Sequence, residues 1–137
     1  MIEIKRNRNC VYQIAYHVVW CCKYRKAIID GEIAEELSKQ IDEICQERDW
    51  CVLSKEIQPE HVHLFLTIPP AVAVAAAVKL LKGITARRLF QKFPTIKQKL
   101  WGGHLWSPSY YVGTAGNVSA ETIRKYIERT GHISRRR

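Results

Sequence analysis

Two histidines, His61 and His63, stand on either side of one valine in the segment PEHVHLFLTIPP (59–70). Imidazole nitrogens bind divalent cations, and two positions along a strand span roughly 6.6 Å, a separation that two imidazoles can close around one ion. Two ligands do not complete a metal site, and the local spacing supplies no third. The alternative is that both histidines lie on a solvated sheet face and bind nothing.

The side chains of a β-strand alternate between its two faces. The apolar set in this segment, which must face the helices, is Val62, Leu64, Leu66 and Ile68. The other set is His61, His63, Phe65 and Thr67. We expect this second set to lie on the opposite, more polar face of the sheet.

Tyrosine is a second chemically useful residue, because a phenol can attack a phosphodiester and become covalently linked to it. A phenol has an ordinary pKa near 10, so it needs a metal, a base or cationic surroundings to act at neutral pH. The candidates are Tyr12, Tyr16, Tyr24, Tyr110, Tyr111 and Tyr126. Tyr126 stands beside Arg124 and Lys125, a setting that favours phosphate, but it is also typical of a tyrosine packed between a helix and a sheet.

The net charge of +9 is unevenly distributed. Residues 30–60 are strongly acidic, whereas residues 61–120 contain seven Lys or Arg and no acid. Such a long acid-free stretch favours a polyanionic partner, above all nucleic acid. The candidate contacts are Lys79, Lys82, Arg87, Arg88, Lys92, Trp106, Arg124 and Lys125. The alternatives are a solvated basic face and, for the aromatic segment LWGGHLWSPSYYVG, loop packing or a subunit contact. The same lack of acids favours a cation with open positions for water or phosphate oxygens.

The elements that must position these residues follow from the hydrophobic pattern. Predicted strands cover 10–25, 50–58, 61–68 and 105–115, and predicted helices cover 31–49, 71–93 and 120–131. Gly83 is a candidate kink in the second helix. The order βαββαβα predicts an α+β fold with an antiparallel sheet and helices on one side, of ferredoxin-like or RRM-like type. Residues 1–137 are expected to form one domain, with a disordered basic tail at 134–137.

Composition excludes several classes of protein. The five cysteines form no CxxC pair, and no signal peptide precedes them, so we expect reduced thiols and a cytoplasmic protein. The longest apolar run, IPPAVAVAAAV, is too short to span a bilayer, so no membrane partner is expected. A two-histidine phosphoesterase would need two facing HxT/S motifs, and only HIS (132–134) fits that pattern.

Three blocks of the sequence resemble the single-tyrosine HUH transposases of the TnpA type, which move insertion sequences as single-stranded DNA. EHVHLFLTIPP matches the histidine–hydrophobic–histidine signature on a strand. LKGITARRLFQKFP is similar to the helix that follows it, and WGGHLWSPSYYVGTAGNVSAETIRKYIE is similar to the tryptophan-rich strand and the nucleophile helix. The three blocks occur in the family's order, and the match runs from about residue 10 to residue 130.

The resemblance implies a role for each matching position. His61 and His63 would bind Mg²⁺ or Mn²⁺, and Tyr126 would be the nucleophile that forms a 5′-phosphotyrosine bond. The partner would be single-stranded DNA with hairpin ends, and a homodimer would share its active sites between subunits. The family commonly has a glutamine four residues after the tyrosine as a further metal ligand, where this chain has Thr130.

That departure keeps two alternatives open. One is a non-catalytic single-stranded nucleic-acid-binding module of the same fold. The other is a domesticated relative that cuts repeat hairpins.

Overall fold

The computed structural model describes residues 4–6, 11–12 and 14–114. Its strands are β1 (Lys5–Arg6), β2 (Val11–Tyr12), β3 (Ala15–Cys21), β4 (Val52–Gln58), β5 (His61–Thr67) and β6 (Tyr111–Thr114). Its α-helices are α1 (Gly31–Glu47), α2 (Val74–Lys92) and α3 (Thr95–Gln98). Two 3-10 turns, η1 (Lys23–Arg25) and η2 (Trp101–Gly103), join these elements. The predicted helix at 120–131 and the predicted tail at 134–137 lie outside the described residues.

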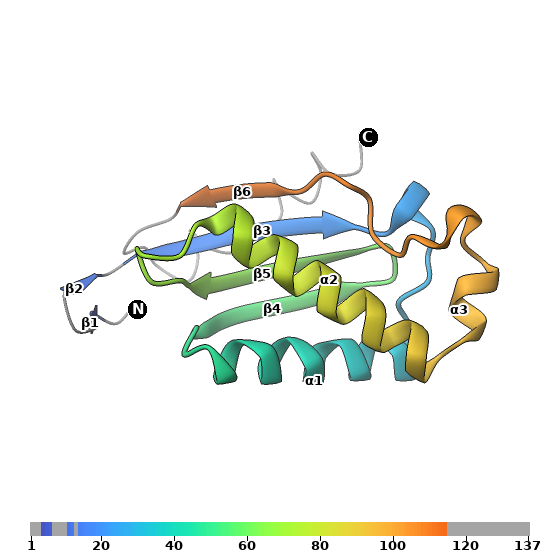
Figure 1. Ribbon diagram of the computed structural model, residues 1–137, viewed down its shortest axis with the longest axis horizontal. Helices are drawn as coiled ribbons and strands as arrows, with labels where there is room; N and C mark the ends of the chain where they lie inside the picture. The colour runs from blue at the N-terminus through green and yellow to red at the C-terminus, as the bar shows by residue number, and fades with distance from the viewer. Residues whose placement is uncertain (1–3, 7–10, 13, 115–137) are drawn as a thin grey trace.

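Strands β3 to β6 form one antiparallel sheet in the order β4-β5-β3-β6, and β1 pairs with β2 in a separate ribbon (Figure 1). Numbered along the chain as first to fourth, the sheet strands lie in the order second, third, first, fourth. This is the order of a ferredoxin-like sheet with split βαβ units. The predicted fold class is therefore confirmed, and so is the hairpin between β4 and β5.

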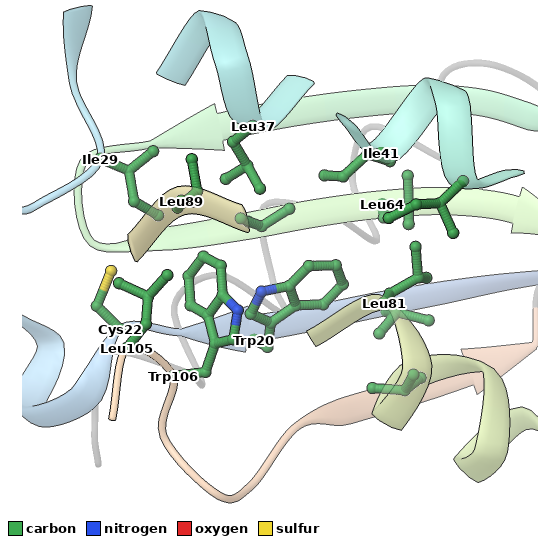
Figure 2. Packing of buried hydrophobic residues seen from close by; sticks show 14 of the residues in the cluster. Trp20, Cys22, Ile29, Leu37, Ile41, Leu64, Leu81, Leu89, Leu105 and Trp106 are labelled. Carbon is green, nitrogen blue, oxygen red and sulfur yellow. The ribbon is translucent and has the colours of Figure 1, made fainter. Parts of the chain in front are cut away.

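Helices α1 and α2 cover one face of this sheet, and the main core lies between them and the strands (Figures 1 and 2). The apolar positions of α1 recur at three- and four-residue spacing, so Leu37, Ile41 and Ile44 all point into the core. The predicted apolar stripe of β5 belongs to the same cluster: Val62, Leu64, Leu66 and Ile68. Its orientation toward the helices is therefore confirmed.

The predicted first strand is too long, because the chain leaves the sheet soon after Cys21. Cys22 forms only an isolated bridge to Trp106, and the η1 turn follows at once. Within that turn Tyr24 and Arg25 have φ values of 58° and 51°, in the left-handed region that a strand cannot contain.

The predicted last strand also begins later, at Tyr111 instead of residue 105. Ser107 N still donates to Cys21 O at 2.8 Å, but the proline that follows, Pro108, has no N–H to continue the ladder. Gly83 does not interrupt α2, which runs unbroken from Val74 to Lys92. Among the described residues, no helix is long and apolar enough to cross a membrane.

Trp106 is buried, contrary to the expectation that its ring stacks on a nucleic-acid base. Only 7% of the residue is exposed, and its indole packs edge-to-face on Trp20 with ring centroids 5.9 Å apart (Figure 2). The indole Nε1 donates to Thr85 Oγ1 at 3.1 Å, and that hydroxyl donates to Leu81 O at 2.7 Å. Trp106 therefore ties the segment before β6 to α2.

Replacing Trp106 with Phe should lower the free energy of unfolding by about 1–3 kcal/mol, because the variant loses buried volume and a buried hydrogen bond. Denaturant unfolding followed by circular dichroism measures this change. At a temperature where the variant is folded, its affinity for a single-stranded oligonucleotide should equal that of the wild type. If the variant kept the stability of the wild type but bound the oligonucleotide more weakly, Trp106 would instead be a nucleic-acid contact.

Candidate active site

His61 and His63 lie next to each other on one face of β5, with ring centroids 4.6 Å apart and ring planes at 75°. They are 2% and 3% exposed, and every residue of the strand is buried. The alternative of a solvated sheet face is therefore wrong for this part of the sheet. The face is opposite the main helical core, as predicted, but it is closed to water at the histidines. A solvated pair of histidines without further contacts is excluded.

The register of the sheet brings a third histidine to the same face. His17 of β3 lies opposite Phe65, and its ring stacks at 18° on His63 with centroids 5.9 Å apart. Burial lowers the pKa of His17 to about 4, so its imidazole is neutral at pH 7. The sequence analysis missed this residue. The available signal was a single polar residue within the apolar run IAYHVVW.

Glu60 is the acid nearest to the pair along the chain, and its Oε1 lies 2.9 Å from His61 Nδ1. A carboxylate on one nitrogen of an imidazole fixes the ring orientation and directs the other nitrogen toward a metal. The backbone holds this arrangement in place, because Cys22 N donates to Glu60 O at 2.8 Å. Glu60 is thus the carboxylate beside Nδ1 of His61.

These donors satisfy part of what a divalent cation requires. Imidazole is a favoured ligand for Zn²⁺, Cu²⁺, Fe²⁺ and Ni²⁺, whereas Mg²⁺ and Mn²⁺ favour oxygen ligands, so either of these two ions would need oxygen ligands besides the two histidines. Within residues 4–6, 11–12 and 14–114, no three His, Cys, Asp or Glu side chains gather as a complete metal site. Water or oxygen atoms of a substrate would complete the coordination of a cation held by the two imidazoles. Tyr126 and Thr130 lie outside the described residues.

The basic residues of α2 divide into two groups. Lys82 Nζ donates to Ser107 O at 2.7 Å and Ser109 O at 3.3 Å, so it holds the segment before β6. Lys92 Nζ lies 2.9 Å from Glu36 Oε1 and joins α2 to α1. Both side chains therefore have structural partners within the fold.

The remaining three are better placed to meet an anion. Lys79 and Arg87 are exposed and stand eight residues apart, with Gly83 between them, so they share one face of the helix. Arg88 is half-buried. Arg124 and Lys125 fall in the part of the chain that the structure does not describe.

Comparison with known proteins places this arrangement in a family. Residues 10–130 match the model of the family described as "Transposase IS200 like". The chain is 43% identical over 127 residues to the ISDra2 transposase TnpA of Deinococcus radiodurans, an alignment that covers 93% of this chain and 91% of that protein. It is 31% identical over 113 residues to the transposase of insertion sequence IS200 from Salmonella typhimurium, covering 82% of this chain and 74% of that protein.

Two solved structures are similar in fold. A crystal structure of a transposase from Deinococcus radiodurans superposes with a TM-score of 0.76 at 38% identity, over 93% of this chain and 98% of that one. A REP-associated tyrosine transposase bound to a REP hairpin gives a TM-score of 0.61 at 12% identity, over 92% of this chain and 69% of that one. With the family model spanning nearly the whole chain and a relative at 43% identity, the chain belongs to the IS200-like transposase family.

Proposed function

We propose that this transposase cuts and rejoins single-stranded DNA at hairpin ends, through a covalent bond to Tyr126 and with a divalent cation held by His61 and His63. The observation that carries the proposal is the buried, edge-to-face pair of imidazoles on β5, with Glu60 on His61 Nδ1. Two imidazoles held side by side are a donor set that can bind one divalent cation.

The strand-transfer step balances without an external energy source. The Tyr126 phenolate oxygen attacks the scissile phosphorus, and the bond from phosphorus to the 3′ oxygen breaks as the bond to tyrosine forms. The phenol loses one proton and the departing 3′ oxygen gains one, which leaves a 5′-phosphotyrosine and a free 3′-OH. Because one phosphodiester replaces another, the reverse attack by a 3′-OH rejoins DNA without ATP.

A cation bound at the two histidines would act as a Lewis acid that polarises the scissile phosphate. The chain's own contribution is orientation. Glu60 Oε1 lies 2.9 Å from Nδ1 of His61, and the ring of His17 stacks on that of His63. The neutral state of His17 adds no positive charge that would repel a cation.

The choice of single-stranded hairpin DNA rests on the family and on the shape of the binding surface. The REP-associated transposase of similar fold is bound to a hairpin. In this chain the exposed basic residues of α2 and the exposed tyrosines Tyr24 and Tyr110 suit an unpaired backbone and unpaired bases. We extend the proposal to a homodimer with shared active sites, since that is the arrangement expected for this family.

A substrate comparison tests the proposed function. Labelled DNA flanking this gene would be supplied as a single strand, as a perfect duplex and as a single strand whose hairpin stem is scrambled, each with Mn²⁺ or EDTA. We expect metal-dependent cleavage of the intact single strand alone. Binding without cleavage would favour the non-catalytic module, and cleavage of the duplex would contradict single-strand specificity.

Replacing both Lys79 and Arg87 with Gln should weaken single-strand binding and reduce its salt dependence. Each phosphate contact on a single strand contributes about 0.7 to the slope of log affinity against log salt concentration, so the slope should fall by about 1.4. Fluorescence anisotropy across a salt series measures both quantities. The control is Lys39→Gln on the acidic helix α1, which should leave the slope unchanged. An unchanged slope in the double variant would remove the α2 face from the binding surface.

Replacing Thr130 with Gln should tighten cation binding, because a carboxamide oxygen reaches farther and is a better ligand than a hydroxyl. Titration of Mn²⁺ followed by electron paramagnetic resonance reports affinity without requiring turnover. We expect tighter binding in Thr130→Gln and no change in Thr130→Val. Equal affinities in all three proteins would show that position 130 does not face the cation.

A further inference from the structure

A pocket with a volume of about 630 Å³ opens where the pairing of β3 with β6 is interrupted. It is lined by residues 19–25, from β3 and η1, and by residues 107–111, which lead into β6. Val19 pairs with Tyr111, and the next contact between the two segments is the bridge from Cys22 to Trp106. Between these two pairing points the chain advances three residues on the β3 side and five on the β6 side, so the segment before β6 has two residues more than the segment opposite it.

Aromatic rings and cations line the mouth of this pocket. Tyr24 is 63% exposed and Tyr110 is 37% exposed, high values for large rings. Lys23 Nζ lies 5.4 Å from the centroid of the Tyr24 ring, and Lys82 Nζ lies 5.8 Å from that of Tyr110. The pocket thus combines π surfaces with positive charge, the combination that binds unpaired nucleotides.

Both walls are held in place by the fold. Tyr24 has a φ of 58°, a backbone conformation that a tyrosine rarely adopts and that keeps its ring outside the core. On the opposite wall, Lys82 binds the carbonyls of Ser107 and Ser109. These constraints give a binding site whose shape exists before a ligand arrives, which lowers the entropic cost of binding.

The floor of the pocket adjoins the candidate metal centre. Cys21 and Val19 line the pocket, and they are the direct cross-strand neighbours of His61 and His63. Residues directly opposite in an antiparallel pair share a face, with Cβ atoms about 4.5–5.5 Å apart. A molecule seated in the pocket therefore lies one strand away from the two histidines.

We propose that this pocket binds one unpaired nucleotide of the DNA strand, the nucleotide that adjoins the scissile phosphate. Its base stacks on the rings of Tyr24 and Tyr110, and Lys23 neutralises its phosphate. The pocket volume falls within the range of about 300–1,000 Å³ that is typical of small-ligand pockets. A pocket of this size accommodates one nucleotide and excludes a base pair with its two backbones. The proposal rests on the proposed function, and it adds a binding site for one nucleotide of the substrate strand beside the two histidines.

Photo-crosslinking tests the proposal directly. Single strands from the DNA flanking this gene would carry 5-iododeoxyuridine at one position at a time around the cleavage site, and mass spectrometry would locate the crosslinked residue. We expect crosslinks to Tyr24 or Tyr110 only when the label adjoins the scissile phosphate. Crosslinks from that position exclusively to residues outside the pocket would overturn the proposal.

Paired variants separate a lost ring from a damaged fold. The double variant Tyr24→Leu, Tyr110→Leu should bind single strands roughly tenfold to a hundredfold more weakly, whereas Tyr24→Phe, Tyr110→Phe should bind like the wild type. Equal affinity of the Leu and wild-type proteins would contradict the proposal. Adduct formation at saturating DNA is measured in parallel. If the wild type forms the adduct and the Leu variant binds as tightly, the pocket fails and the proposed function stands; if the wild type forms none, the proposed function itself fails.

Discussion

Replacing Tyr126 with Phe should abolish DNA cleavage and covalent adduct formation while leaving single-strand affinity within about twofold of the wild type. The change removes one oxygen atom, the nucleophile in the proposed reaction, and keeps the ring. Attack by hydroxide in place of tyrosine would release a free 5′-phosphate that cannot be rejoined, so strand transfer would be lost in either case. Denaturing gels of labelled single strands measure cleavage, and fluorescence anisotropy measures binding.

The matched control is Tyr16→Phe, which removes the same hydroxyl from a half-buried tyrosine of β3. This variant should cleave DNA at the wild-type rate. If Tyr126→Phe still formed an adduct, the nucleophile would have to be sought among the other five tyrosines. If it lost binding together with cleavage, Tyr126 would be a contact residue and not the attacking group.

Replacing His61 or His63 with Ala should reduce metal-dependent cleavage by at least about 100-fold. Loss of a residue that only hydrogen-bonds to a metal ligand already lowers metal affinity or activity by about 10–100-fold. His61 and His63 are the proposed ligands themselves, so their loss should cost at least as much. Raising the Mn²⁺ concentration should recover part of the activity in each single variant and none in the double variant. Chelation by EDTA should stop the wild-type enzyme, and added Mn²⁺ should restore it.

His104 offers a matched control, because it is an exposed histidine on the segment after η2. His104→Ala should retain wild-type cleavage and the same dependence on Mn²⁺. Calorimetric titration of Mn²⁺ supplies a readout independent of turnover, and the alanine variants at positions 61 and 63 should each lose the binding heat. Wild-type heats in those variants would place the cation elsewhere.

Local patterns predicted the parts of the fold that depend on neighbours in sequence. The alternation of β5, its tight connection to β4 and the apolar spacing of α1 each follow from a single periodicity. The burial of the histidine face did not follow from any local pattern. It depends on the tertiary structure, in which pairing across the sheet places His17 of β3 beside His63 on the same face.

The parts of the site that are adjacent in sequence could be predicted from the residues alone, and the parts that are distant in sequence could not. The histidine pair stands out in seven residues of sequence, whereas the roles of Tyr126 and Thr130 came from the family resemblance. Trp106 was placed wrongly because an aromatic residue near glycines looks the same whether it stacks on a base or on Trp20. The pocket beside β3 was also out of reach, since it arises from unequal chain lengths between two pairing points and from the φ of Tyr24.

The most direct test of the central claim is to find the covalent bond itself. Labelled single strands from the DNA flanking this gene would be incubated with the protein and Mn²⁺ or EDTA, and mass spectrometry of the digested product would identify the modified residue. We predict a 5′-phosphate adduct on Tyr126 that forms with Mn²⁺ and is absent with EDTA. Tight binding of the same strands without an adduct, or an adduct that forms equally in EDTA, would contradict a metal-assisted tyrosine transposase.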